Sequence, residues 1–221
     1  AHDLGLEFGC TPFYLDAVDI LEPFVDFYKI ASYELTWGDL FKKCSKVGKP
    51  LAFSVGMATI EEIRMVVELV NLEEIESLTI LHCTSSYPSP SIESNLASIG
   101  YLRRIFKDIV ETNNFKIGWS DHSRSPAVIY RAVHHYDADE IEFHLDLDGL
   151  GEEYEGGHCW LPDEIKTVIH NVNTGFNSDG KPGVFISPSE MSDRDWRADP
   201  SDGLRPMKEL RKKLKYSGKK F

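Results

Sequence analysis

The sequence predicts an α/β fold of the TIM (β/α)8-barrel type, with about six of the eight βα units present in this chain. Six short apolar runs begin near Leu6, Phe27, Pro50, Leu78, Phe115 and Glu140. Segments of helical period separate them, and such alternation is typical of a parallel sheet covered by helices. The first run has no GxGxxG motif after it, which disfavours a dinucleotide-binding fold and leaves the barrel as the favoured architecture.

The segments between the apolar runs predict helices. In ATIEEIRMVVELV, Thr59 is followed three residues later by Glu62, which predicts a capping box at the start of a helix. Apolar residues within 60–70 then recur on one face. Pro162 in LPDEIKTVIHNV suits the first turn of a further helix.

Two regions of different composition divide the chain. Residues 1–184 carry the strand and helix pattern, and we expect them to form the partial barrel. Residues 185–221 are rich in Ser, Asp, Pro and charge and predict an extended C-terminal segment. Its basic tail, from Lys208 to Phe221, has seven Lys or Arg against one Glu, and we interpret it as a solvated terminal helix.

Charge and hydropathy limit the partners. The net charge of −12 repels nucleic acid and anionic membrane surfaces. No apolar run is long enough to cross a bilayer, and AHDLGLEFGC lacks the features of a signal peptide. The chain does not begin with Met, so we interpret it as a processed product or a fragment.

The four cysteines are sparse, and no two of them form a CxxC pair. This spacing argues against a zinc ribbon or a redox motif. Free thiols are typical of a reducing compartment, so we expect a cytoplasmic protein.

Polar side chains gather at the carboxyl ends of the predicted strands, where parallel α/β proteins bind ligands. A lysine surrounded by hydroxyls suits a phosphate group. Lys29 lies inside the apolar run FYKIAS, and a buried lysine needs an anionic partner. The alternatives are that the hydroxyls serve turns, that Glu34 begins a helix and that Tyr87 only packs. The polar set is Thr11, Lys29, Ser32, Glu34, Ser54, Ser85, Tyr87, Ser120, Asp121, His122 and His144.

His122 and His144 follow consecutive predicted strands. Neighbouring parallel strands lie about 4.8 Å apart, so the two imidazoles can share one divalent ion that keeps open positions. Asp121 would then orient a ligand or contact substrate. Either histidine alone fits a structural or acid–base role, whereas the pair favours a metal site.

The motifs KIASYE, FSVGMATIEEI, LHCTSSYP, IGWSDHS and EFHLDLD occur in this order. Together they resemble the N-acetylneuraminate (sialic acid) synthase family, which includes legionaminic and pseudaminic acid synthases, over residues 4–170. The resemblance implies a (β/α)8 barrel that condenses phosphoenolpyruvate with an N-acetylhexosamine such as N-acetylmannosamine. The product is a nine-carbon 2-keto sugar acid, phosphate is released, and the metal is Mn²⁺ or Mg²⁺.

The resemblance also implies residue roles. His122 and His144 would be the metal ligands, Asp121 and Glu34 are the candidate catalytic residues, and Glu34 also binds sugar. Glu155 would replace a sugar-binding acid of the family's loop after the last strand. The phosphoenolpyruvate and phosphate ligands would be Thr11, Lys29, Ser32, Ser54, Ser85, Tyr87 and Ser120.

The chain departs from the family pattern in several places. Cys10 stands where the family usually has Ser, and Tyr33 stands where it usually has Gly, which would narrow the sugar pocket. Two N-terminal βα units and the antifreeze-like domain have no counterpart in this sequence. We therefore expect an open sheet that self-associates as a homo-oligomer or has low stability.

Two other functions stay open. One is another phosphoenolpyruvate-dependent synthase, acting on arabinose 5-phosphate or erythrose 4-phosphate. Its second phosphate needs more basic residues, whereas Lys29 is the only Lys or Arg in the strand-end motifs and Arg124 lies close by. The other is a non-catalytic partial barrel that binds a sugar or an anion.

Overall fold

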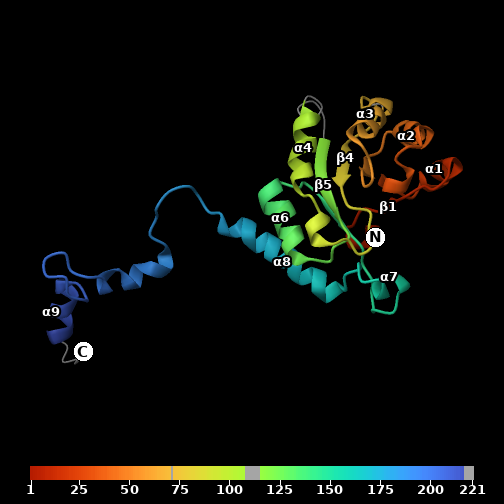
Figure 1. Cartoon of the computed structure of the whole chain (residues 1–221). Helices are drawn as coiled ribbons and strands as arrows, with labels where there is room; N and C mark the ends of the chain where they lie inside the picture. Colours follow the sequence, from red (N-terminus) through yellow and green to blue (C-terminus); the bar gives the residue numbers. More distant parts are fainter. Residues whose placement is uncertain (71, 108–114, 217–221) are drawn as a thin grey trace. The chain divides into compact units, whose positions relative to one another are not determined.

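The computed structural model describes residues 1–70, 72–107 and 115–216 (Figure 1). The chain forms two compact units, Ala1–Ser178 and Asp179–Phe221. The first unit contains the sheet and every predicted site residue.

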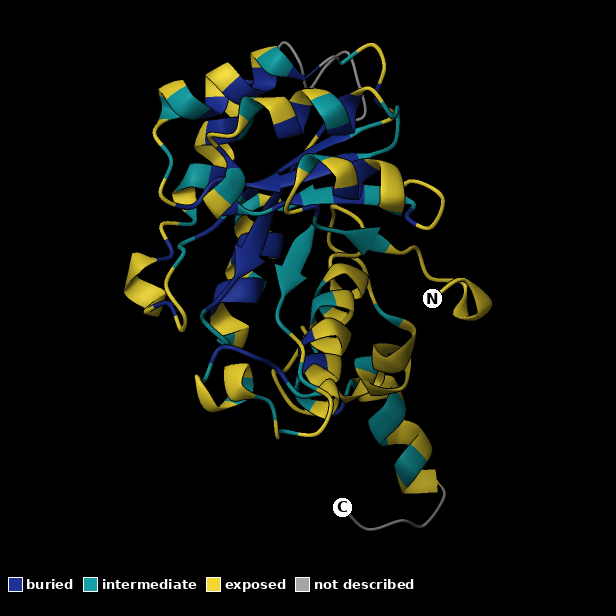
Figure 2. Ribbon diagram, turned by 90° about the vertical axis from the view of Figure 1, so that its right-hand side faces the viewer, coloured by how far each residue is buried: buried dark blue, intermediate teal, exposed yellow. Residues whose placement is uncertain are grey.

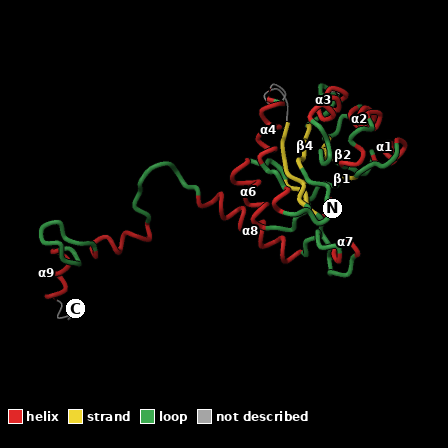
Figure 3. Tube along the Cα trace, viewed as in Figure 1, coloured by secondary structure: helices red, strands yellow, loops and turns green. Residues whose placement is uncertain are grey.

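Six parallel strands make one sheet, and they pair in the order of the sequence. This arrangement confirms the predicted partial barrel, in which strands alternate with helices along the chain (Figure 3). Among the described residues, the first and last strands each pair on one side only. The strands are β1 (Gly9–Cys10), β2 (Phe27–Ile30), β3 (Leu51–Ser54), β4 (Leu78–His82), β5 (Phe115–Asp121) and β6 (Ile141–Phe143).

The helices begin where the sequence signals them. Thr59 Oγ1 accepts a hydrogen bond from the Glu62 amide at 3.3 Å, and the Glu62 carboxylate accepts one from the Thr59 amide at 2.8 Å. This is the predicted capping box, and Pro162 opens the last helix of the unit. The helices of the first unit are α1 (Leu15–Leu21), α2 (Gly38–Ser45), α3 (Ile60–Leu69), α4 (Ala97–Ile105), α6 (Pro126–Tyr136), α7 (Glu152–Glu155) and α8 (Pro162–Ser178), with short 3-10 helices η1 (His2–Leu4), η2 (Ser32–Glu34) and η3 (Ser91–Glu93).

The core lies between the helices and one face of the sheet. Successive strand side chains point to opposite faces, so Tyr28 and Ile30 are fully buried in this core whereas Lys29 between them faces the other way. Phe53 and Trp119 fill the same core from β3 and β5. Figure 2 shows buried strands in the middle of the sheet, strands of intermediate burial beside them, and helices with exposed outer sides. The opposite, inner face of the sheet is left for polar side chains.

The second unit has its own local structure. Among its described residues, the regular elements are a 3-10 helix, η4 (Pro188–Trp196), and the basic helix α9 (Lys208–Tyr216). The Asp199 carboxylate accepts hydrogen bonds from Ser201 and from the Lys208 amide, and these bonds lower the pKa of Asp199 to about 2. Across both units, none of the described helices has the length and apolar character needed to span a membrane.

Candidate functional site

A pocket of about 260 Å³ opens at the carboxyl ends of the strands. It brings together eight of the twelve predicted site residues, which come from the six strands and their following loops. Glu34, Ser85, Asp121 and Glu155 are the four that do not line it. The lining residues are Thr11, Lys29, Ala31, Ser32, Ser54, Tyr87, Ser120, His122, Glu142, Phe143 and His144.

Lys29 lies on the inner face of β2, with its side chain only 12% exposed. Its Nζ donates a hydrogen bond to Ser54 Oγ at 2.7 Å and lies 3.3 Å from a carboxylate oxygen of Glu142. Ser120 Oγ donates to the other oxygen of the same carboxylate at 2.7 Å. Glu142 is therefore the anionic partner that Lys29 requires, and our sequence reasoning missed it. The available signal was its position two residues before His144, on the same face of a strand.

His122 is buried, and its Nδ1 lies 2.8 Å from the Thr84 carbonyl oxygen. A carbonyl can only accept, so Nδ1 carries the proton and Nε2 keeps a free lone pair. Burial lowers the pKa of His122, and so does the nearby His144, although the bond to Thr84 opposes them. The imidazole is therefore neutral at pH 7, which is the form that binds metals.

The rings of His122 and His144 lie 5.2 Å apart, centre to centre. Tyr87 packs against His122 with ring centres 4.3 Å apart, and burial raises the pKa of Tyr87 to about 12. The phenol thus stays neutral beside the imidazoles. Two imidazoles at one end of a pocket fit the predicted divalent ion.

Asp121 lies on the opposite face of β5 from its neighbours and is fully buried. Its carboxylate accepts hydrogen bonds from the indole N–H groups of Trp119 and Trp160, at 3.2 and 3.4 Å, and from Ser123 Oγ at 2.6 Å. These bonds fix the turn that follows His122. Asp121 is therefore a positioning residue, and it does not face the pocket.

Glu34 and Ser85 do not line the pocket, but Glu34 follows the lining residue Ser32 by two positions. One carboxylate oxygen of Glu34 is buried and has no hydrogen-bond partner in the described part of the chain, which is costly unless a ligand satisfies it. Ser85 lies next to Ser32 across Gly56. A Cβ at Gly56 would come within 2.0 Å of Ser85 Oγ and 3.0 Å of Ser32 Oγ, so only glycine allows this close approach.

The loop after β6 places a different acid near the histidines than the sequence predicted. Glu155 is exposed on α7. Glu153, from the same short helix, lies 3.4 Å from His144 Nδ1 and 3.8 Å from His158 Nε2. Sequence reasoning missed Glu153 and Cys159; the signal was the His158–Cys159 pair in a glycine-rich loop.

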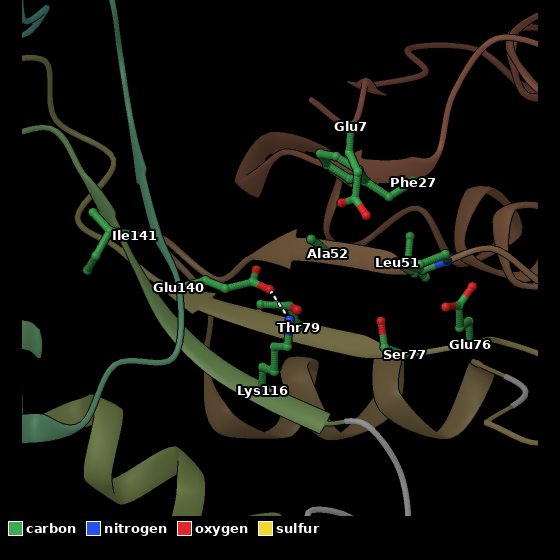
Figure 4. Close-up of a pocket in the computed structure, with 11 residues that line it drawn as sticks. Glu7, Phe27, Leu51, Ala52, Glu76, Ser77, Thr79, Lys116, Glu140 and Ile141 are labelled. Atoms are coloured by element: carbon green, nitrogen blue, oxygen red, sulfur yellow. Dashed lines mark hydrogen bonds and ion pairs between the residues drawn. The ribbon is translucent and has the colours of Figure 1, made fainter. Parts of the chain in front are cut away.

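A second pocket, about 600 Å³ in volume, lies at the amino ends of the strands (Figure 4). Its lining includes Glu7, Glu76 and the ion pair between Lys116 and Glu140 at 2.7 Å, and none of the predicted site residues. It is larger than the carboxyl-end pocket, but ligands of (β/α) barrels bind at the carboxyl ends of the strands. We therefore assign the candidate site to the smaller pocket.

Comparisons with known proteins agree with the motifs. The NeuB family model matches residues 1–182. The chain is 36% identical to an uncharacterized protein of Methanocaldococcus jannaschii over 86% of its own length and 54% of the relative's. It is 34% identical to the N,N'-diacetyllegionaminic acid synthase of Campylobacter jejuni over 78% of its length and 50% of the relative's.

The chain thus spans about half the length of these curated relatives. The crystal structure of an N-acetylneuraminic acid (sialic acid) synthetase from Leptospira borgpetersenii superposes with a TM-score of 0.69 at 25% identity. That match covers 91% of this chain and 68% of the other. The family model, the curated relatives and the crystal structure agree with the resemblance seen in the motifs, and the chain belongs to the NeuB family.

Proposed function

We propose that this chain forms part of a sugar-acid synthase that condenses phosphoenolpyruvate with an N-acetylhexosamine such as N-acetylmannosamine. In the balanced reaction, phosphoenolpyruvate, the aldehyde and water give a nine-carbon 2-keto sugar acid and phosphate. One observation carries the proposal: a single pocket holds Lys29, three serine hydroxyls and the His122–His144 pair. The names of the relatives, a legionaminic acid synthase and a sialic acid synthetase, support the same reaction class.

The lysine and the hydroxyls would hold the phosphate end of phosphoenolpyruvate. Lys29 is already bonded to Ser54, and Ser32 and Ser120 line the same pocket. An incoming phosphate would compete with Glu142 for Lys29, because both are anions near the same ammonium group. Fixed donors of this kind also stabilise the charge on the leaving phosphate.

The histidine pair would hold the divalent ion, Mn²⁺ or Mg²⁺. When bound, such an ion polarises the aldehyde carbonyl. His122 presents Nε2 because its Nδ1 is tied to Thr84, and Asp121 keeps the turn after His122 in place. For the sugar hydroxyls, the unpartnered oxygen of Glu34 is better placed than the exposed Glu155.

The test is phosphate release from phosphoenolpyruvate in the presence of Mn²⁺ and N-acetylmannosamine. The full chain is assayed beside His122→Ala and His144→Ala, with EDTA as a further arm. His170→Ala is the matched control, because His170 is exposed on α8 and away from the pocket. We expect release that requires the metal and the acceptor and that both site variants lose.

A second acceptor substrate distinguishes the proposed function from that of a synthase acting on a phosphorylated sugar. Arabinose 5-phosphate carries a phosphate of its own, whereas Lys29 is the one fixed cation among the lining residues. We therefore expect no release with that acceptor. Release with arabinose 5-phosphate but not with N-acetylmannosamine would replace the proposed substrate class. Release that persists in EDTA or in both histidine variants would overturn the site.

A further inference from the structure

The loop after β6 gathers a second set of metal-binding groups beside the site. His144, Glu153, His158 and Cys159 each offer one ligand atom, and these four atoms all lie within 4.8 Å of one another. His158 and Cys159 are buried, whereas the Glu153 side chain is 70% exposed. Only His144 belongs to both this cluster and the histidine pair of the pocket.

The backbone explains why residues far apart in the loop meet. The Trp160 amide donates to the His144 carbonyl at 2.8 Å, and the Asp146 amide donates to the Trp160 carbonyl at 2.9 Å. These bonds form a parallel bridge that returns the chain beside the end of β6. The Asp146 side chain accepts from the Gly149 amide at 2.6 Å, which holds the turn before α7. The cluster is thus positioned by the fold before any ion binds.

The separations suit a tetrahedral ion. Zinc bonds of about 2.0–2.3 Å place neighbouring ligand atoms about 3.3–3.8 Å apart. Glu153 Oε2 lies 3.4 Å from His144 Nδ1, 3.8 Å from His158 Nε2 and 3.8 Å from Cys159 Sγ. Since no pair exceeds 4.8 Å, shifts of about 1 Å complete the shell.

The donor types select the metal. A thiolate and two imidazoles favour zinc over Mn²⁺ and Mg²⁺, which prefer oxygen ligands. His158 is 6% exposed, and its Nε2 lies 3.8 Å from a carboxylate oxygen of Glu153. That separation is too long for a hydrogen bond but suits two ligands of one metal ion. We propose that His144, Glu153, His158 and Cys159 form a zinc-binding site next to the phosphoenolpyruvate pocket.

Zinc at this site would also control the pocket. His144 cannot complete the pair with His122 while it binds zinc in the loop. Resting on the proposed function, this predicts that zinc inhibits Mn²⁺-dependent phosphate release and that Cys159→Ala relieves the inhibition. Zinc binding displaces the Cys159 thiol proton to solvent.

The test is titration of the metal-free full chain with Co²⁺, followed by absorption spectroscopy and displacement with Zn²⁺. We expect a thiolate-to-cobalt charge-transfer band that one equivalent of Zn²⁺ removes. Cys159→Ala should abolish the band. Cys44→Ala is the matched control and should retain it, because Cys44 is an equally buried free thiol on α2.

Two further variants test whether a loss of binding reflects misfolding, and whether the metal binds in the loop cluster or in the phosphoenolpyruvate pocket. Glu153→Gln changes an exposed side chain, and we expect zinc affinity to fall about 10-fold or more. His122→Ala should lose Mn²⁺ but keep the cobalt band. A wild-type chain without a thiolate band, or a band that survives Cys159→Ala, would overturn the zinc site. A Cys159-dependent band without phosphate release would support the zinc site and count only against the proposed function.

Discussion

At each end of the inner face of the sheet, a lysine pairs with a glutamate of the β6 segment. At the carboxyl ends, Lys29 lies 3.3 Å from Glu142, and at the amino ends, Lys116 lies 2.7 Å from Glu140. The side chain of Lys29 is 12% exposed and that of Lys116 is 47% exposed. The Lys116–Glu140 ion pair, although it has the shorter N–O distance, is therefore the more solvated one. Solvated ion pairs contribute little to stability.

This difference shows why the carboxyl end of the sheet, rather than the amino end, is suited to bind a ligand. Lys29 also donates a hydrogen bond to Ser54 and shares its pocket with two imidazoles. At this end, an anionic ligand would therefore meet a desolvated cation with other polar groups beside it. Lys116 has acids around it, and the hydrogen bond from Lys116 to Glu140 raises the pKa of this lysine. The carboxyl end is thus suited to an anionic ligand, and the amino end is suited to an internal ion pair.

The largest effect should come from the imidazoles, which only the carboxyl end has. We expect His122→Ala and His144→Ala each to lower Mn²⁺ affinity at least about 100-fold, because changes outside the ligand shell alone cost about 10- to 100-fold. Isothermal titration calorimetry measures this, with His170→Ala as control. Unchanged Mn²⁺ affinity in both variants would contradict the assignment of a metal site to the carboxyl end.

The two lysines allow the most direct comparison of the ends. Lys29→Met should lower phosphoenolpyruvate affinity about 10- to 100-fold, since a charged hydrogen bond contributes about 1.5–3 kcal/mol. Lys116→Met should leave that affinity unchanged. Equal losses in the two variants, measured by equilibrium dialysis with Mn²⁺ present, would contradict the assignment of the site to the carboxyl end.

A smaller effect is expected from two glycines. At Gly56 an added Cβ would meet Ser85 and Ser32, whereas at Gly100 on α4 it would meet nothing within 4 Å. Gly56→Ala should lower the free energy of unfolding by about 1–3 kcal/mol and weaken phosphoenolpyruvate binding. Gly100→Ala should raise the free energy of unfolding by about 0.4–1 kcal/mol. Urea unfolding checks both values, and a neutral Gly56→Ala would show that the serines are free to move.

The smallest effect concerns pH and the fold rather than the pocket. Burial lowers the pKa of His82 below its ordinary 6.5, against the opposing hydrogen bond to the Ser94 carbonyl. The unfolded chain binds this proton more readily, so stability is full above about pH 6.5 and falls as the pH drops below it. His82→Gln should reduce the fall between pH 7.5 and 5.5, and exposed His170→Gln should not. Identical pH profiles for all three proteins would contradict this account.

The strand order and the helix starts could be predicted because they depend on local patterns. Apolar runs marked five strands closely, and the Thr59–Glu62 pair marked the start of α3. The first run, from Leu6, gave only the short strand Gly9–Cys10. A run of apolar residues shows that a strand can form but not how many of its residues find a partner.

The site could be predicted where a residue lies near the end of a strand, as Lys29 does, or directly follows it, as His122 does. The site could not be predicted where the position of a side chain depends on the strand face it occupies or on a loop that returns to the strand. Asp121 follows Ser120 in the sequence, yet the two-residue period turns its side chain to the opposite face. Glu153 reaches His144 only because Trp160 bridges back to the end of β6, a contact that spacing alone does not reveal.

The central claim is that one pocket at the carboxyl ends holds both the metal and phosphoenolpyruvate. The most direct measurement is the ³¹P nuclear magnetic relaxation of phosphoenolpyruvate with the chain and substoichiometric Mn²⁺, because the paramagnetic effect falls steeply with distance. The account predicts strong relaxation that His122→Ala and Lys29→Met remove and that Lys116→Met retains. Relaxation that Lys116→Met removes and Lys29→Met retains, or none at all with both ligands bound, would contradict it.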